Sequence, residues 1–313
     1  MSMNFTSDAM QSNLGFVLSQ ITLIEPTVYA IKYPDIRYRG IVPVETTGNP
    51  WAKTVTYMSM DGVGKARWIA DKASDVPVVG VQMDKGETSI HMAGIGYDYG
   101  IEEIAQAQML GIPLESTKAN LARRVSEEMI DRVAFDGDTL KGFSGLFNYP
   151  GVTAASVPNG VGGSPLWTSK TGDEALADVN AILSGVYAGT GYTSIADTLL
   201  MSLDRQNLLA SKRLGETGET VLSFLMRANV YTATTGRPLT IRGLRGLETA
   251  GAGATQRMIA YRNAPEVLKM HVPMPHRFLD VQVQGLRYVV PGIFRLGGLD
   301  VRLPKEVRYA DGY

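Results

Sequence analysis

The stretch that most constrains the fold is "ESTKANLARRVSEEMIDRVAFDGD", residues 115–138, in which apolar side chains recur at helical spacing. This spacing predicts one long amphipathic helix with charged residues over its remaining surface. Ser116 or Thr117 is the expected N-cap, and Gly137 is the expected stop. We expect the buried face of the helix to contain four residues at intervals of four: Leu121, Val125, Met129 and Val133.

Directly after this helix comes "GFSGLFNYPGV", residues 142–152, in which glycines, an asparagine and a proline surround a short apolar core. The stretch contains no general base, no metal ligand and no phosphate-binding loop. Its glycine, asparagine and proline residues are therefore expected to shape the backbone rather than to take part in chemistry.

The region before the long helix is expected to be extended. Residues 1–50 carry four spaced prolines, which discourage long helices and predict an arm. In residues 53–60, "KTVTYMSM", side chains alternate as in a strand, and Asp61 with Gly62 then supplies a tight-turn signal. The following "KARWIAD", residues 65–71, continues in extended register, so we predict a β-hairpin.

A second alternating segment, residues 76–100, is interrupted at Lys85 and Gly86. It is followed by "YGIEEIAQAQMLGIP", which predicts a short helix that ends at Gly111 and Pro113.

The second half of the chain mixes helix and strand signals. Thr171 and Glu174 match a capping box at the start of a helix. We expect strands at "SIADTLLMS", "PLTIRGLRGLE" and "RMIAYR", short helices at "LDRQNLLAS" and "ETVLSFLMRAN", and β-structure again over residues 270–309. Together these segments predict an α+β fold.

Composition and charge exclude several classes of function. Thirty basic and thirty-one acidic residues give a net charge of −1, so no global field attracts the protein to nucleic acid or to an anionic membrane. The chain has no cysteine, which excludes disulfides, thiol catalysis and cysteine-ligated metals. No apolar run reaches the ~18 residues of a membrane span, and the first residues lack the pattern of a signal peptide. We expect a cytoplasmic protein without membrane contact.

No set of residues points to catalysis. "DGVGKAR" lacks the first half of a phosphate loop, and the prolines between His271 and His276 prevent the helical spacing of many zinc sites. We therefore expect no cofactor, no metal and no enzymatic activity. The alternative from another class is an α+β hydrolase or transferase that uses Glu102, Glu127 or His271.

The run "YDYGIEEIAQAQMLGIPLESTKANLARRVSEEMIDRVAFDGD", followed by "GFSGLFNYPGV", resembles the major capsid proteins of tailed bacteriophages and the encapsulin shells that share their Hong Kong 97 fold. The likeness lies in the order of a tyrosine-led short helix, a long spine helix and a glycine-bounded turn. The ending "GIFRLGGLDVRLPKEVRYADGY" also resembles the endings of these shell proteins, at Gly297, Gly298 and Pro304.

In this family the turn leads from the spine helix toward the axial domain, and the resemblance gives its residues structural roles. Gly145 is expected to permit a close approach of two backbone segments. Asn148 and Pro150 are expected to shape the turn, while Leu146 and Phe147 anchor it.

The resemblance also divides the chain into parts. It implies an N-terminal arm at 1–50, an extended loop at 51–90, a peripheral domain at 91–150 and 266–300, and an axial domain at 151–265 and 301–313. A lysine–asparagine crosslink, which some members form, is not assigned to any residue.

The function implied by the resemblance is that of a major capsid protein, which self-assembles through pentamers and hexamers into an icosahedral shell around phage double-stranded DNA. Its implied partners are copies of itself, scaffolding, portal or decoration proteins, and packaged DNA through non-specific contacts. Its implied location is the virion capsid, assembled in the cytoplasm of the host bacterium. An encapsulin-like compartment that encloses a cargo enzyme is the alternative that remains open.

Overall fold

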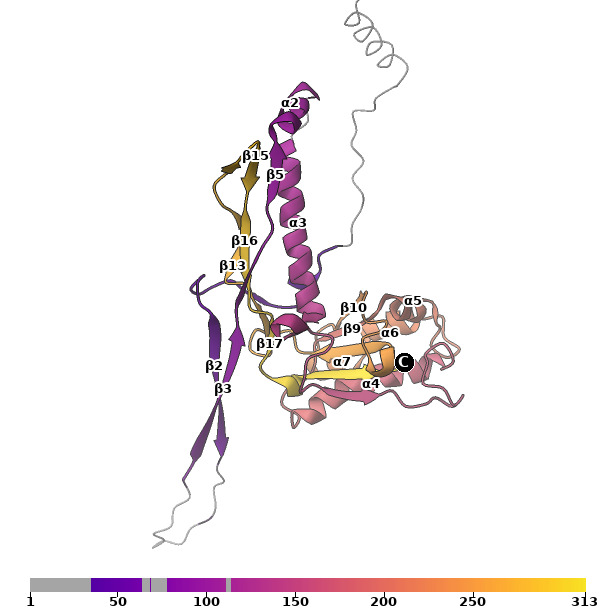
Figure 1. Ribbon diagram of the computed structural model, residues 1–313. Helices are drawn as coiled ribbons and strands as arrows, with labels where there is room; N and C mark the ends of the chain where they lie inside the picture. Colours follow the sequence, from indigo (N-terminus) through magenta and orange to yellow (C-terminus); the bar gives the residue numbers. More distant parts are fainter. Residues whose placement is uncertain (1–34, 64–67, 69–77, 111–113) are drawn as a thin grey trace, which may run out of the picture. The chain divides into compact units, whose positions relative to one another are not determined.

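The computed structural model describes residues 35–63, 68, 78–110 and 114–313. The chain divides into two units, Met1–Asp35 and Ile36–Tyr313, and the following description concerns the second unit. This unit contains both helices and β-sheets, as expected for an α+β protein (Figure 1).

The largest sheet has five strands. Their order is β10 (Thr240–Leu244), β9 (Thr198–Ser202), β11 (Arg257–Tyr261), β18 (Val307–Asp311) and β8 (Thr153–Ser156). The two outer pairs, β10 with β9 and β18 with β8, are parallel, and the two inner pairs are antiparallel. The strands predicted at "SIADTLLMS", "PLTIRGLRGLE" and "RMIAYR" are therefore confirmed as β9, β10 and β11.

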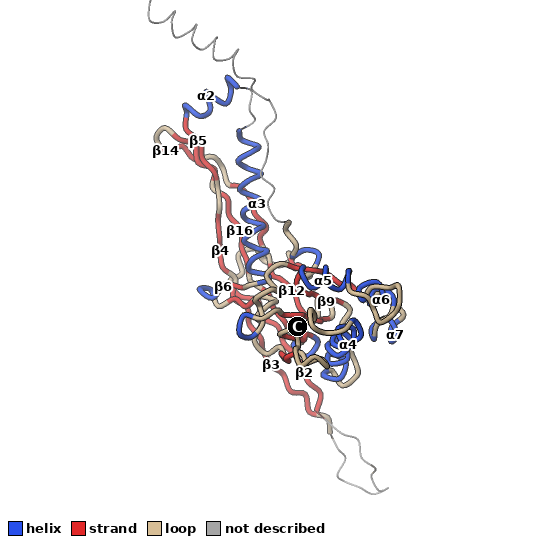
Figure 2. Tube along the Cα trace, turned by 90° about the vertical axis from the view of Figure 1, so that its right-hand side faces the viewer, coloured by secondary structure: helices blue, strands red, loops and turns tan. Residues whose placement is uncertain are grey.

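This sheet separates two hydrophobic cores, because side chains along a strand point alternately to opposite faces. In β11, Met258 and Ala260 belong to one core, and Ile259 and Tyr261 belong to the other. The core around Met258 is completed by α4 (Gly172–Gly189), α5 (Leu203–Ser211), α6 (Val221–Arg227) and α7 (Val230–Thr235), drawn as blue tubes in Figure 2. The capping box that starts α4 is present as predicted.

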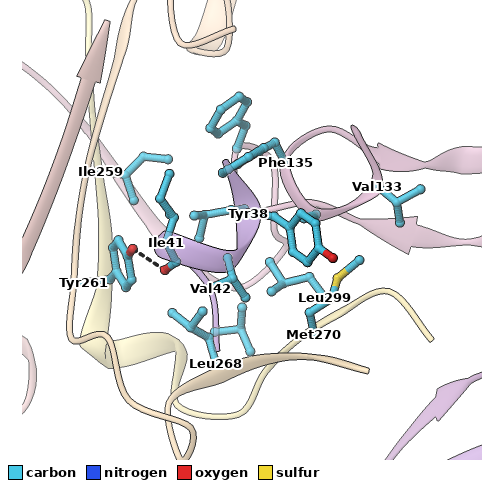
Figure 3. Packing of buried hydrophobic residues seen from close by; sticks show 14 of the residues in the cluster. Tyr38, Ile41, Val42, Val133, Phe135, Ile259, Tyr261, Leu268, Met270 and Leu299 are labelled. Atoms are coloured by element: carbon cyan, nitrogen blue, oxygen red, sulfur yellow. Dashed lines mark hydrogen bonds between the residues drawn. The ribbon is translucent and has the colours of Figure 1, made fainter. Parts of the chain in front are cut away.

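The other core includes a segment that the sequence assigned to the arm. Tyr38 and Ile41 are buried among residues of several elements, and the Tyr261 hydroxyl donates a hydrogen bond of 2.6 Å to the carbonyl oxygen of Ile41 (Figure 3). Tyr38 begins the short helix η1 (Tyr38–Gly40), and β1 (Val44–Glu45) pairs with β12 (Leu268–His271), which in turn pairs with β17 (Leu299–Val301). The predicted end of the arm at residue 50 is therefore not a structural boundary, since residues 36–45 are part of this core.

Two helices, one of which is the predicted long helix, and two small sheets form the next region of the subunit. The helices are α2 (Ile101–Leu110) and α3 (Leu114–Phe135), and both predicted helices are thus confirmed. One sheet has the order β13 (Met274–Phe278), β16 (Gly292–Leu296), β4 (His91–Gly94), and the other has the order β14 (Gln282–Gln284), β15 (Arg287–Val290), β5 (Tyr97–Gly100). Because α3 already begins at Leu114, Ser116 and Thr117 lie inside its first turn, and the predicted N-cap is wrong.

A long β-hairpin is formed by β2 (Thr54–Val63) and β3 (Gly80–Ser89), which lie side by side in Figure 1. The hairpin was predicted, but its turn was misplaced. Asp61 and Gly62 are not at a turn, because they lie within β2 and pair with Gln82 and Val81 of β3. The connection lies between residues 63 and 80, and the predicted strand "KARWIAD" falls mostly outside the described residues.

The remaining short elements connect these parts. They are β6 (Gly137–Asp138), η2 (Thr139–Lys141), β7 (Phe143–Ser144), η3 (Ala252–Ala254) and η4 (Pro304–Glu306).

Candidate assembly surfaces

The buried face of α3 is not the predicted one. Leu121 is 51% exposed and Val125 is 37% exposed, so their predicted burial is wrong, whereas Val133 is buried and Met129 packs against the core. The reason is geometric, since four residues turn an α-helix by about 400°, and three such steps separate residues 121 and 133 by about 120° around the axis. The buried residues of α3 are Ala122, Ser126, Ile130, Asp131, Val133, Ala134 and Phe135.

Asp131 ties the C-terminal half of α3 to the start of the second unit. Its carboxylate oxygen Oδ1 accepts hydrogen bonds from the backbone N–H groups of Arg37 (2.7 Å) and Tyr38 (2.9 Å), and Oδ2 lies 3.3 Å from the Arg37 guanidinium. The same guanidinium lies 4.9 Å from the ring of Phe135 and donates to the carbonyl oxygen of Arg245. Arg37 therefore holds three separate segments in one place, and nothing in the local sequence pattern indicated this.

Glu127 is a structural partner in the same region. Its carboxylate accepts hydrogen bonds from the Tyr38 hydroxyl and from the Arg39 guanidinium, both at 2.7 Å. Burial and the hydrogen bond to Glu127 raise the pKa of Tyr38 to about 12. A cavity of about 370 Å³ lies beside these residues, and its lining combines core side chains such as Ile130 and Val272 with the polar Thr46 and Glu127.

The three residues of the enzyme alternative do not form one site. Neither Glu102 nor His271 lines the cavity beside Glu127. Glu102 is exposed on α2 and pairs with Gln106, while His271 is buried 3.5 Å from Asp300. Within the described residues, no group of three or more acidic or histidine side chains is placed to hold a metal ion, and none of the helices is long and apolar enough to cross a membrane.

The turn after α3 closes the end of that helix. The N–H groups of Leu146 and Phe147 donate to the carbonyl oxygens of Ala134 (2.8 Å) and Phe135 (2.9 Å), which are among the last carbonyls of the helix. A Cβ atom on Gly145 would lie 2.1 Å from the Phe135 oxygen, so the close backbone approach expected at Gly145 is present.

Asn148 fixes this turn with both ends of its side-chain amide. Its Oδ1 accepts from the N–H of Gly145 (2.8 Å), and its Nδ2 donates to the carbonyl oxygen of Asp136 (2.9 Å). Leu146 and Phe147 are buried, while Pro150 is exposed at the turn that follows. A role of these residues in assembly stays a prediction.

The residues singled out near the C-terminus lie against other segments. A Cβ atom on Gly297 would lie 3.0 Å from the Cβ of His271, and Gly298 adopts a φ of +68° beside the ring of Phe143. Pro304 begins η4. The two glycines thus allow the chain to pass close to β12 and β7, and an assembly role for all three residues stays a prediction.

Many large apolar side chains are exposed on an isolated subunit. Single exposed apolar residues are ordinary, but several on one element are candidates for a protein interface. Three parts of the subunit carry two or more of them. On α2 and α3 they are Ile101, Met109, Leu121 and Val125, on the hairpin Met58 and Met83, and around β14 Leu279, Val281, Val283 and Leu286.

Comparisons with known proteins agree with an assembling subunit. A family model for "Major capsid protein" matches residues 64–313. The chain is similar in structure to a chain of the capsid of Myoviridae phage XM1, with 19% identity, full coverage of both chains and a TM-score of 0.78. It is also similar to a chain of Mycobacterium phage Bobi, with 13% identity, 99% coverage of each chain and a TM-score of 0.61. A chain of a virus-like particle from Pyrococcus furiosus is similar as well, with 14% identity, 87% coverage of this chain, 91% coverage of that chain and a TM-score of 0.52. No curated protein sequence matches the chain.

Proposed function

The chain belongs to the major capsid protein family and forms an icosahedral shell, and we propose that this shell is built from pentamers and hexamers and encloses phage double-stranded DNA. The observation that carries the proposal is the family match over residues 64–313. The exposed apolar groups support it, because subunits of a closed shell cover such groups with neighbouring copies.

We assign the parts of the subunit as follows. The hairpin serves as the extended loop, the region of α3 with its two small sheets serves as the peripheral domain, and the five-stranded sheet with its helices serves as the axial domain. The subunit is a structural protein without enzymatic activity. It assembles in the cytoplasm of the host bacterium, with scaffolding, portal and decoration proteins as further partners and non-specific contacts to DNA.

The first experiment is negative-stain electron microscopy of the protein expressed alone, together with sedimentation velocity. Closed shells or capsomer rings are expected, and shells that contain nucleic acid would support a capsid over an encapsulin-like compartment. Shells that contain a cargo protein instead, or a subunit that stays monomeric at high salt and with crowding agents, would argue against the proposal.

Removal of the outer hairpin should abolish closed shells and leave a folded subunit. Met58 pairs with Lys85, so replacing residues 58–85 by Asn-Gly shortens both strands equally and supplies a two-residue turn. The melting temperature should stay near that of the wild type, because β2 and β3 pair with no third strand among the described residues. Wild-type shells from this variant would contradict the role given to the hairpin.

Aspartate at Leu121 or Val125 should prevent assembly without unfolding the subunit. Both side chains reach solvent in the isolated subunit, so a charge there costs little stability, but it would become buried in a contact with a neighbouring copy. Ile130→Asp is the matched control on the same helix, and because Ile130 is buried it should unfold the protein. Circular dichroism and sedimentation separate these outcomes, and normal shells from Leu121→Asp would exclude this surface from the interface.

A further inference from the structure

One residue, Ile90, separates β3 of the hairpin from β4 of the body, and side-chain contacts on either side of it add to what fixes the direction of the hairpin. Among the described strands, β2 and β3 form a two-stranded sheet of their own, so no backbone ladder attaches them to a larger sheet. A two-stranded hairpin is only marginally stable by itself and gains its orientation from what it packs against. At its base, Ile90 is buried and lies close to Gly297.

A second contact reaches further along the hairpin. The guanidinium of Arg302, which follows β17, lies 4.7 Å from the centre of the Tyr57 ring in β2. Tyr57 is three residues beyond the first residue of β2, which places it about 10 Å along the strand. A contact at this distance from the base resists tilting of the hairpin better than a contact at the base itself.

The position of the Tyr57 ring is also fixed within the hairpin, by the partner strand. Tyr57 pairs with Gly86 of β3, and a Cβ atom on Gly86 would lie 2.2 Å from Cζ of the ring. The ring therefore extends across its partner strand and occupies the space that a side chain at position 86 would fill. This gives a physical reason for the glycine that appeared from the sequence to interrupt the strand.

Hydrogen bonds to the body of the subunit fix the position of Arg302. Its Nε donates a hydrogen bond of 3.0 Å to Oδ2 of Asp300, whose side chain is buried in β17, and its backbone N–H donates to the carbonyl oxygen of Val267. His271 Nε2 lies 3.5 Å from the same carboxylate oxygen. The guanidinium can bond Asp300 through its edge and still offer its flat face to an aromatic ring, which a lysine ammonium cannot do.

We propose that Arg302 and Tyr57 form a latch that sets the direction of the hairpin relative to β17. The latch presents the outer hairpin to a neighbouring copy at a defined place and so lowers the conformational entropy lost on assembly. This inference rests on the proposed function, in which the hairpin contacts a second copy of the chain. Arg302 and Tyr57 are positioning residues, because they act on assembly through the orientation of the hairpin.

The test measures hairpin position and assembly separately. Because the chain has no cysteine, Met83→Cys on the hairpin and Lys305→Cys on the body can carry a pair of spin labels at two exposed positions. The shell yield is measured in variants without these two cysteines, because Met83 belongs to the exposed apolar side chains of the hairpin. Tyr57→Phe keeps the ring and should give the narrow distance distribution of the unsubstituted protein and normal shells. Tyr57→Leu should broaden the distribution and reduce the yield of closed shells, with an unchanged melting temperature. Arg302→Lys should broaden the distribution and reduce the yield in the same way, and it should also lower the melting temperature, because it removes the hydrogen bond to the buried carboxylate of Asp300.

Two further results decide whether Arg302 and Tyr57 act through one shared contact. The double variant Tyr57→Leu, Arg302→Lys should give a distance distribution no broader than that of the broader single variant, since both substitutions remove the same contact. Unchanged distance distributions in the single variants, or effects that add in the double variant, would overturn the latch. If the 58–85 deletion still forms closed shells, the proposed role of the hairpin fails instead, and the distance measurement still reports on the latch.

Discussion

Gly145→Ala is expected to destabilise the subunit by about 3 kcal/mol, at the upper end of the usual cost of inserting a methyl group into a packed site. The added Cβ would lie 2.1 Å from the Phe135 oxygen and 2.6 Å from the Asp136 nitrogen. Both are backbone atoms at the end of α3, so they cannot rotate away as a flexible side chain would. Relief requires the turn to move, which breaks the hydrogen bonds from Leu146 and Phe147 to the last carbonyls of the helix.

Thermal and denaturant unfolding would measure this loss, with two glycine controls. A Cβ atom on Gly40 meets no atom within 4 Å, so Gly40→Ala should change stability little. Gly142 also has free space but adopts a φ of +71°, so Gly142→Ala should cost only about 1 kcal/mol of backbone strain. If Gly145→Ala unfolds no earlier than Gly142→Ala, the close approach is not needed for stability.

The long helix shows which features the local sequence pattern predicts and which it does not. The existence of α3 follows from its apolar periodicity, and the structure confirms it. The buried face depends on a small difference in period, because residues four apart drift around the helix by about 40° per step. Val133 is buried while Leu121 is exposed for this reason, and the proposed contact with a neighbouring copy would explain the apolar character of Leu121.

The hairpin shows a second limit of prediction from the local sequence. Asp-Gly is a strong turn signal, yet Asp61 and Gly62 lie in β2 because ten consecutive residue pairs join β2 and β3, which outweighs one local preference. Gly86 looked like a break for a similar reason, although what it accommodates is the Tyr57 ring from the other strand. Which glycine marks a turn and which makes room for a neighbour is decided by strand pairing.

Pairs of charged residues far apart in the sequence were not predictable at all. Asp131 binds Arg37 across 94 positions, and its place on the helix looked like an ordinary solvated charge. The chain has thirty basic and thirty-one acidic residues, so composition offers many equivalent pairings. Only the tertiary fold determines that this carboxylate is buried and satisfied.

Asp311→Ala is expected to cost about 3–5 kcal/mol, as the loss of one partner from a buried ion pair does. Both carboxylate oxygens of Asp311 lie 2.7 Å from nitrogen atoms of Arg257, and both side chains are buried. The hydrogen bonds to Asp311 raise the pKa of Arg257, whose guanidinium stays charged at any accessible pH. The alanine variant would therefore bury a cation without its counter-charge.

Denaturant unfolding of matched variants isolates this effect. Asp98→Ala removes an exposed partner of Arg287 and should cost less than about 1 kcal/mol. Removing both buried charges, as Arg257→Met with Asp311→Leu, should be less harmful than Asp311→Ala alone, because no unpaired charge is left. Equal costs for Asp311→Ala and Asp98→Ala would show that the buried pair is not needed for stability.

The Arg257–Asp311 pair also distinguishes folding from assembly. Arg257 donates a further hydrogen bond of 2.6 Å to the carbonyl oxygen of Phe147, so it joins the five-stranded sheet to the turn that closes α3. Loss of Asp311 should thus lower the melting temperature and the shell yield together. Leu121→Asp should lower the shell yield alone, because its side chain lies outside both cores. A variant of Asp311 that melts early yet assembles at the normal yield would show that shell contacts supply the stability that the isolated subunit has lost.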